Sequence, residues 1–311
     1  MSVLRLGTRG SQLAVWQAKY AATCINEEFP GINIEIRTIR TKGDKILDVA
    51  LSKIGDKGLF TKEIEKELIN GNIDMAVHSM KDMPTVLEKG LVIGAVLKRE
   101  EPRDVLISAK RYKFNNLPQG AVVGTSSLRR TAQLKAIRPD INVVDIRGNV
   151  ETRIKKMIEN DLDAIIVAYA GVKRLGMETY ISDYLPYELM LPAVGQGAIA
   201  VECRSDDKNI LNMAARINHE ETMAATFAER AFLRTLEGGC QMPVAALAQI
   251  KDGKLVLEGL MASLDGSMLY RDKFTGKVED AEIIGISLAE KLLKDGGQKI
   301  LKEIKRQGKR L

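Results

Sequence analysis

The residue with the most distinctive chemical setting is Cys240, which follows two glycines and stands three residues before a proline. Gly238 and Gly239 permit backbone conformations that other residues avoid, and Pro243 prevents a helix from resuming. This setting predicts a loop that presents the thiol to a partner outside its own segment. A cysteine can also be a small buried side chain, and the local sequence leaves both interpretations open.

Arginines gather at or near turns that follow predicted strands. A guanidinium group matches a carboxylate or phosphate through two parallel hydrogen bonds, and hydroxyls and helix N-termini add further donors. One such arginine could be a surface residue, worth about 0 to 1 kcal/mol in an exposed pair, but the group predicts a site for several anions. The arginines are Arg9, Arg129, Arg130, Arg147, Arg153 and Arg174, and the hydroxyls beside them belong to Ser11, Thr125, Ser126 and Ser127.

Carboxylates are the favoured anions for these arginines. The chain has neither a G-x-x-x-x-G-K-[ST] loop nor a G-x-G-x-x-G turn, the two glycine-rich patterns that wrap phosphates. Arginine forks without such a loop suit separate planar anions. We therefore expect a ligand that carries several carboxylates.

Asp82 is the candidate acid–base residue. It follows Lys81 in a short loop after an apolar strand, where α/β domains present reactive side chains. A carboxylate here could shuttle protons or stabilise a developing positive charge. An aspartate turn or a surface pair with Lys81 explains the same residues at least as well. His78 fits a core or supporting role better than that of a base.

Histidine and cysteine usage excludes several other chemistries. The chain has two histidines, His78 and His219, and three cysteines, with no C-x-x-C pair. The odd cysteine count argues against a disulfide framework or a structural zinc site and indicates a reducing compartment. The distance between the histidines in the sequence disfavours a histidine-rich metal centre or a histidine-based triad. We expect no metal.

A repeated β-turn-α plan positions these side chains. The first copy is expected to have strands at 3–6, 32–39 and 75–78 and helices at 12–28 and 61–70, with Leu13, Trp16 and Tyr20 on one face of the first helix and Thr61 as the cap of the second. The second copy has expected strands at 121–123, 142–146 and 164–168, with helices from 128 and at 150–159. The polar segment 42–58 is long enough to be a lid.

Changes of pattern near 98–102 and 192–197 predict two hinge segments, and the strand 198–202 is expected to return to the first domain. Beyond it we expect a helix at 222–235, three strands joined at two Asp-Gly turns, and a helix at 281–295. The predicted domains are 1–98 with 198–217, then 102–193, then 219–311. The predicted fold class is therefore two similar α/β domains of the periplasmic-binding-protein type joined by a hinge, plus a small α+β C-terminal domain, with ligand at the carboxyl ends of the strands.

The composition and charge of the chain limit which kinds of partner can be expected. The 311 residues carry a net charge of +6, which suggests an acidic partner, but aromatic residues are only 5% and no nucleic-acid-binding motif is present. The basic run 299–310 is typical of a solvated helix face. No apolar run reaches the roughly 20 residues of a membrane span, and the N-terminus lacks a signal-peptide pattern. We expect a cytoplasmic protein with no nucleic-acid or membrane partner.

Five blocks of sequence, in order along nearly the whole chain, closely resemble the porphobilinogen deaminase family. They are Arg9–Ala14, Val77–Pro84, Val123–Arg130, Arg147–Arg153 and Glu237–Pro243. The resemblance implies a transferase of tetrapyrrole biosynthesis that joins four porphobilinogen molecules head to tail, releasing ammonia at each step and finally hydroxymethylbilane. It also implies a dipyrromethane primer bound covalently through Cys240. Asp82 would help to protonate the leaving amine and stabilise positive charge on the pyrrole nitrogens.

The resemblance also divides the remaining site residues between two sides, although the growing chain must shift as it lengthens. The incoming substrate, which carries an acetate and a propionate, would meet Arg9, Ser11, Gln17, Arg147 and Arg153. The cofactor side would comprise Ser79, Lys81, Thr125, Ser126, Ser127, Arg129, Arg130 and Arg174. We expect a monomer.

A non-catalytic two-domain binding protein for a carboxylate ligand is the alternative, since the repeated α/β plan would suit it equally. Cys240 distinguishes the two hypotheses, because a binding module needs neither the third domain nor its thiol.

Overall fold

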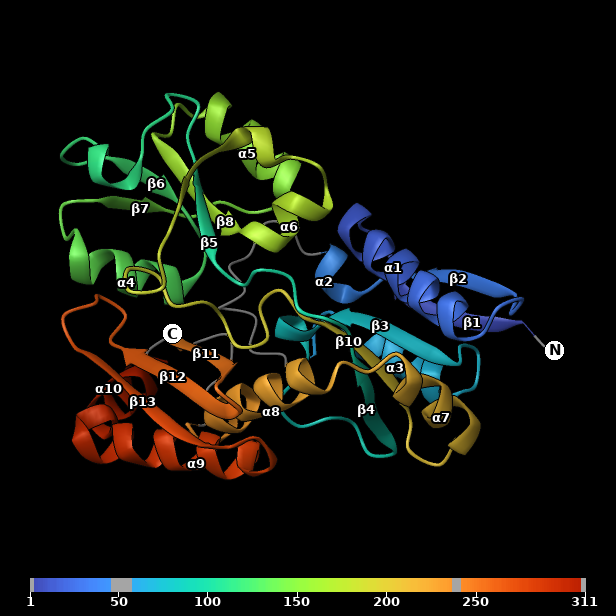
Figure 1. Ribbon diagram of the computed structural model, residues 1–311. Coiled ribbons are helices and arrows are strands. Elements are labelled where there is room, and N and C mark those ends of the chain that lie inside the picture. The colour runs from blue at the N-terminus through green and yellow to red at the C-terminus, as the bar shows by residue number, and fades with distance from the viewer. Residues whose placement is uncertain (1–2, 46–57, 237–241, 309–311) are drawn as a thin grey trace. The chain divides into compact units, whose positions relative to one another are not determined.

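The computed structural model describes residues 3–45, 58–236 and 242–308 (Figure 1). The chain forms two compact units. Unit 1 contains Met1–Val49, Gly55–Glu100 and Gly197–Met223, and unit 2 contains Ala50–Ile54, Glu101–Gln196 and Ala224–Leu311. Most of the predicted lid, and Cys240 with its two glycines, lie outside the described residues.

Unit 1 is built on a five-stranded sheet with the order β2-β1-β3-β10-β4. β1 pairs in parallel with β2 and β3, whereas β10 is antiparallel to β3 and β4. The carboxyl ends of β1 and β3 therefore meet at one edge of the sheet. The strands are β1 (Leu4–Arg9), β2 (Ile34–Ile39), β3 (Met75–Ser79), β4 (Leu91–Val96) and β10 (Ile199–Arg204).

The helices of unit 1 are α1 (Gln12–Glu28), α2 (Lys42–Lys45), α3 (Lys62–Ile69) and α7 (Lys208–Arg216), with a 3₁₀ turn at Met80–Asp82 after β3. Two of these helices, α1 and α3, were predicted from the sequence, whereas α2 and α7 were not. Thr61 does precede α3, but its hydroxyl makes no capping hydrogen bond. Its backbone is already helical (φ −120°, ψ −35°), whereas a capping residue normally has an extended backbone, so the predicted cap is wrong.

The buried face of α1 is made mainly by alanines, with Ile25 near its end. Ala18, Ala21 and Ile25 are fully buried, so the helix approaches the sheet closely. Trp16 and Tyr20 share a face as predicted and stack with ring centroids 5.5 Å apart, but Trp16 is 37% exposed. Trp16 therefore lies at the surface, whereas Tyr20 is partly buried and packs against the core of unit 1.

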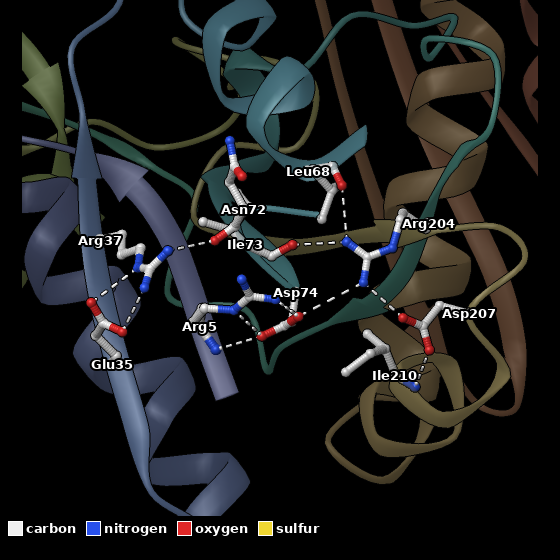
Figure 2. A network of polar contacts seen from close by, with 10 residues as sticks. All are labelled: Arg5, Glu35, Arg37, Leu68, Asn72, Ile73, Asp74, Arg204, Asp207 and Ile210. Carbon is white, nitrogen blue, oxygen red and sulfur yellow. Dashed lines mark hydrogen bonds and ion pairs between the residues drawn. The ribbon is translucent and has the colours of Figure 1, made fainter. Parts of the chain in front are cut away.

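A network of charged side chains joins the amino-terminal ends of β1 and β3 to the end of β10 (Figure 2). Asp74, just before β3, accepts two hydrogen bonds from the Arg5 guanidinium at 2.7 and 3.0 Å and one from the Arg5 backbone N–H at 2.8 Å. Arg204 lies 3.8 Å from the same carboxylate and pairs with Asp207 at 2.7 Å. This edge of the sheet is opposite to the carboxyl ends of β1 and β3.

Unit 2 begins with a second five-stranded sheet of the same plan, in the order β7-β6-β8-β5-β9. β6 is parallel to β7 and β8, and β5 is antiparallel to β8 and β9. The expected pair of similar α/β domains is confirmed by this shared order. The strands are β5 (Asp104–Ile107), β6 (Val122–Gly124), β7 (Asn142–Val144), β8 (Ala164–Ala168) and β9 (Ile181–Tyr184).

Three helices accompany this second sheet, and two of them begin with a side-chain cap. Ser127 caps α4 and Asn149 caps α5, each by accepting a hydrogen bond from a backbone N–H three residues later. The helices are α4 (Leu128–Ile137), α5 (Val150–Glu159) and α6 (Tyr169–Arg174), with 3₁₀ turns at Phe114–Asn116 and Glu178–Tyr180.

The remainder of unit 2 is the small α+β part, a three-stranded antiparallel meander β11-β12-β13. Asp252 and Gly253 form the first turn with φ of 50° and 71°, the conformation that a two-residue hairpin requires. The second turn contains Gly266, so both predicted Asp-Gly turns are confirmed. The elements are α8 (Glu220–Thr235), β11 (Val244–Lys251), β12 (Lys254–Ala262), β13 (Leu269–Lys277), α9 (Ala281–Leu292) and α10 (Gln298–Gly308), with a π-helical segment Leu293–Gly297 between the last two.

Both faces of the meander are covered. On one face, α8, α9 and α10 bury a large apolar cluster that includes Phe232, Leu257 and Leu288 (Figure 1). On the other face, Leu247 and Leu260 pack with Ala132 of α4. The small part is therefore attached to the second sheet domain through α4.

Candidate active site

A small hollow of about 60 Å³ lies in unit 1 where β1 and β3 end. The β1–α1 turn, the start of α3 and the 3₁₀ turn after β3 contribute its walls. It brings together five residues that the sequence assigned to the site. Its lining comprises Arg9, Ser11, Leu13, Ala14, Gln17, Phe60, Thr61, Val77, His78, Ser79 and Asp82.

Two of these residues hold each other in place. The Gln17 side-chain amide donates to the Ser79 hydroxyl at 2.8 Å, and the Ser79 hydroxyl lies 3.1 Å from the Gln17 amide oxygen. Gln17 is only 2% exposed. The bond fixes α1 to the end of β3, directly before the turn that carries Lys81 and Asp82, both of which are exposed.

Arg9 is held by Asp44 and Phe60. Its Nε and Nη2 lie 3.2 and 2.5 Å from one carboxylate oxygen of Asp44, and its guanidinium lies 4.1 Å from the centre of the Phe60 ring. Burial alone would raise the pKa of Asp44, but the hydrogen bonds and charge of Arg9, with those from Thr41, lower it below its usual value. The ion pair orients the Arg9 guanidinium in the wall of the hollow.

In unit 2, three hydroxyl residues form the turn between β6 and α4. The Ser126 hydroxyl donates to the Ile146 carbonyl at 2.8 Å and accepts from the Ile146 N–H at 3.1 Å, so it joins this turn to the segment after β7. Ser127 caps α4, and the Thr125 hydroxyl accepts from the Ser127 N–H at 3.3 Å. The turn is thus rigidly held at the start of a helix, where backbone N–H groups favour anions.

Arg129 and Arg130 are engaged inside unit 2. Each lies 2.8 Å from a different oxygen of Asp104, which is fully buried, and each also donates to a backbone carbonyl, Leu191 for Arg129 and Ile166 for Arg130. Burial alone would raise the pKa of Asp104, but the two arginine charges hold it well below its usual range. Only the remaining N–H groups of these arginines can serve a ligand.

Three further arginines of unit 2 that were assigned to the site differ in their hydrogen bonds and in their burial. Arg153 donates through Nε to the Gly148 carbonyl at 2.8 Å. Arg147 has two buried nitrogens, Nε and Nη2, without a hydrogen-bond partner among the described residues. Arg174, the last residue of α6, is 9% exposed. Arg147 is therefore the arginine of this turn with unused donors.

The two described cysteines make poor nucleophiles. Burial raises the pKa of the Cys203 thiol to about 12, and it also raises that of Cys24. The thiolate is the reactive form of cysteine, so neither suits alkylation at neutral pH. Across the parts of the chain that the structure describes, no group of three or more His, Cys, Asp or Glu side chains could hold a metal ion.

Comparison with known families decides the identity of the chain. Residues 4–212 match the model described as porphobilinogen deaminase, dipyromethane cofactor binding domain, and residues 223–294 match porphobilinogen deaminase, C-terminal domain. The chain belongs to the porphobilinogen deaminase family. The resemblance seen in the sequence blocks is thereby confirmed.

Curated members of the family resemble the chain over their whole length. Porphobilinogen deaminase of Syntrophomonas wolfei subsp. wolfei is 61% identical, with 98% of this chain and 100% of that protein covered. The porphobilinogen deaminase of Carboxydothermus hydrogenoformans is 56% identical, with 97% of each chain covered.

Two solved structures with low sequence identity are similar to part of the chain. The periplasmic VFT2 domain of Bordetella pertussis BvgS is 13% identical with a TM-score of 0.42, covering 69% of this chain and 86% of that chain. A probable amino-acid ABC transporter extracellular-binding protein, ytmK of Bacillus subtilis, is 9% identical with a TM-score of 0.41, covering 69% and 90%.

Three residues that matter to this deaminase-family site were not predicted from the sequence. Asp44 and Phe60 fix Arg9, and Asp104 fixes two arginines. Asp44 lies within the segment 42–58 that was interpreted as a lid and Phe60 follows that segment closely, which is the signal that could have drawn attention to them. Asp104 gives no such signal, because its partners lie about 25 positions away and only the sheet brings them together.

Proposed function

We propose that this chain is a hydroxymethylbilane synthase, that is, a porphobilinogen deaminase that joins four porphobilinogen molecules head to tail with release of ammonia. The match of both family models across residues 4–212 and 223–294 carries this proposal. The hollow in unit 1 supports it, because a carboxylate, an arginine and two neutral hydrogen-bonding side chains converge there. The proposal extends to a monomer that acts in the cytoplasm without a nucleic-acid or membrane partner.

The residues of unit 2 fit a dipyrromethane cofactor attached through Cys240. Such a group carries several carboxylates, and the Nε of Arg130, which is buried without a hydrogen-bond partner among the described residues, is a donor that a carboxylate would satisfy. The hydroxyls and helix start at Thr125, Ser126 and Ser127 supply further donors. When bound, the group provides the first pyrrole for chain extension and keeps the product attached to the protein.

We assign the side chains as follows. Asp82 protonates the leaving amine of porphobilinogen and stabilises the positive charge that develops, because it is an exposed carboxylate in the wall of the hollow. The carboxylates of the incoming substrate bind Arg9, Ser11, Gln17, Arg147 and Arg153. The residues on the cofactor side are Ser79, Lys81, Thr125, Ser126, Ser127, Arg129, Arg130 and Arg174.

Intact mass spectrometry, Ehrlich's reagent and an assay of porphobilinogen consumption test the function together. We expect a mass above that of the bare polypeptide, a positive colour reaction and turnover of porphobilinogen. Apoprotein would show the bare mass but would gain activity once primed. A chain with the bare mass, no colour reaction and no turnover even after incubation with porphobilinogen would contradict the proposal.

A further inference from the structure

The chain passes from unit 2 back into unit 1 through three buried residues, 196–198, which we call the return segment. Gln196 is the last residue of this part of unit 2, and Gly197 is the first residue of the returning part of unit 1. Gln196 and Ala198 are each only 1% exposed. The polar groups of the return segment must therefore find their hydrogen-bond partners inside the protein.

Within unit 2, the side chain of Gln196 binds the carboxylate that holds Arg129 and Arg130, which we call the arginine pair. Its Nε2 donates to Asp104 Oδ1 at 2.9 Å and to the Pro102 carbonyl at 2.6 Å. The same Oδ1 accepts from Arg130 Nη2 at 2.8 Å, and Oδ2 lies 2.8 Å from Arg129 Nη1. Since a carboxylate accepts several hydrogen bonds at once, Gln196 helps to fix the direction of Asp104 and, through it, of both guanidinium groups.

Within unit 1, the backbone of Ala198 supports the turn that carries Asp82. The Ala198 carbonyl accepts a hydrogen bond from the Met80 N–H at 3.1 Å, and Met80 is the first residue of the 3₁₀ turn Met80–Asp82. Met80 is 1% exposed and packs in one apolar cluster with Ala198, whereas Asp82 is exposed. The return segment therefore anchors the buried end of a short turn whose other end carries the candidate acid–base residue.

Gly197 lies between these two contacts and leaves no room for a side chain. Its φ is 86°, a conformation that favours glycine. Its carbonyl accepts from the N–H of Glu100, which stands at the other crossing of the chain between the units, at 3.2 Å. A Cβ at Gly197 would lie 2.3 Å from the Glu100 carbonyl oxygen. Because that oxygen belongs to the backbone, no side-chain rotation can relieve the clash, and the return segment itself would have to move.

We propose that the return segment positions both groups of site residues, the arginine pair of unit 2 and the Asp82 turn of unit 1. Gln196 acts on the arginine pair through Asp104, and Ala198 acts on the turn through its carbonyl. The contacts come from consecutive residues, so a shift of the backbone at Gly197 is passed to both. Gln196 is thus a positioning residue and need not touch the substrate. The inference rests on the proposed function.

Gln196→Met tests the contact with the arginine pair, because methionine keeps the size of the side chain and removes the donor. We expect the kcat of the holoenzyme to fall about tenfold while KM changes less than about twofold, since small misplacements of positioning groups lower turnover and the pair is assigned to the cofactor side. The apoprotein should also gain the cofactor mass more slowly when it is incubated with porphobilinogen.

Ser108→Ala is the matched control for Gln196→Met. Ser108 is 2% exposed and directly follows β5, the strand that begins with Asp104, and its hydroxyl donates to the Asp163 carbonyl at 2.6 Å. The change removes a buried hydrogen bond from the same strand without touching the arginine pair. It should lower the unfolding temperature, while kcat and the rate of cofactor gain stay at their wild-type values.

Gly197→Ala tests the contact with the Asp82 turn, and Gly90→Ala is its control. The two glycines have nearly the same φ, 86° and 89°, but a Cβ at Gly90 would have no neighbour within 4 Å. Hydrogen–deuterium exchange of a peptide that covers 78–84 measures the anchoring of Met80 without measuring turnover. We expect faster exchange and at least about tenfold lower kcat in Gly197→Ala, and wild-type exchange and kcat in Gly90→Ala.

The outcomes separate this inference from the proposed function. Wild-type kcat in Gln196→Met, equal losses of kcat in Gln196→Met and Ser108→Ala, or wild-type exchange of 78–84 in Gly197→Ala would each overturn the role of the return segment. If Gly197→Ala does not fold, Ala198→Gly replaces it, because it loosens the segment without adding an atom and should also speed the exchange. A wild-type chain that does not turn over porphobilinogen would instead contradict the proposed function and leave the exchange result intact.

Discussion

Asp82 is the residue on which the proposed chemistry depends most directly. We expect Asp82→Asn to retain the mass of the cofactor but to lower kcat at least about 100-fold, since acid–base groups typically contribute factors of 10² to 10⁴. Intact mass and porphobilinogen consumption measure the two effects separately. Asp206→Asn, a change at an exposed aspartate outside the hollow, is the control and should behave as wild type.

Asp104 is the residue whose loss should affect stability most. Asp104→Asn would leave the buried guanidinium groups of Arg129 and Arg130 without their anion, which we expect to cost about 3 to 5 kcal/mol in the free energy of unfolding. Urea denaturation measures this cost. Asp140→Asn breaks the partly exposed pair with Arg138 and should cost much less; an equal cost in both variants would contradict the interpretation.

For single residues, the sequence indicates which side chains could take part in chemistry better than it indicates which residues they contact. The arginines at the turns and the carboxylate of Asp82 could be selected because side-chain type and position after a strand were enough. The Gln17–Ser79 bond joins residues 62 positions apart, and the Asp104 pairs depend on the second sheet. These contacts depend on the tertiary structure and cannot be identified from the residues that are close in the sequence.

Among the structural elements, the sheet edge around Asp74 should make stability depend on pH. Burial alone would raise the pKa of Asp74, but its bonds to Arg5 and the charge of Arg204 lower it. A carboxyl group with a lowered folded-state pKa stabilises the protein above its unfolded-state pKa of about 3.9, and this contribution is lost as the pH falls towards the folded-state value.

We therefore expect Asp74→Asn to cost about 1 to 3 kcal/mol in unfolding free energy at pH 7, and the difference from wild type to shrink as the pH falls below about 4. Urea unfolding at several pH values measures both effects. Glu35→Gln is the control, since its pair with Arg37 is exposed, and the change should alter the unfolding free energy very little. A difference that grows on acidification would have the wrong sign for this mechanism.

The two hairpin turns of the meander make a matched pair. Gly253 and Gly266 both have positive φ, 71° and 75°. A Cβ on Gly266 would lie 2.4 Å from the Ala132 carbonyl of α4, whereas one on Gly253 would have no neighbour within 4 Å. We expect Gly253→Ala to cost about 1 kcal/mol through backbone strain alone and Gly266→Ala to cost clearly more. Thermal unfolding compares them, and equal losses would show that the turn can move away from α4.

The elements that the sequence predicted best are those with a clear start signal and a regular pattern. The bounds of α1, α5 and β8 agree with the predicted ones. The strands β5 and β9 were not predicted, because each has only four residues and shows no alternation long enough to recognise. The prediction that Thr61 caps α3 was wrong because the residue type does not show whether the backbone has the angles that a cap needs.

For the whole molecule, the decisive prediction concerns Cys240. Cys240→Ser should yield the bare polypeptide mass, no reaction with Ehrlich's reagent and no turnover. It should also unfold at a lower temperature than the holoenzyme, because it lacks a cofactor that interacts with groups such as Arg130 only in the folded state. Cys24→Ser is the control and should keep the added mass and the activity. A binding module would instead keep its affinity for a carboxylate ligand in Cys240→Ser.

The repeated plan of the molecule could be predicted from sequence because each copy has the same succession of strand, turn and helix. The strand order could not, since β5 and β10 enter their sheets antiparallel and from a distance in the chain. The division 1–98 with 198–217, 102–193 and 219–311, and the hinge motion it implies, stay predictions. In the described residues no helix is long and apolar enough to cross a membrane.

The charged network around Asp74 also has a practical consequence for engineering. In unit 1 it occupies the amino-terminal edge of the sheet (Figure 2). The hollow with Asp82 lies instead where β1 and β3 end, at the carboxyl-terminal edge. Directed evolution for heat tolerance could therefore be confined to surface positions such as Glu35, Arg37 and Asp207. Variants changed only at that edge could gain resistance to heat inactivation without changes at the residues that line the hollow, so turnover should be retained.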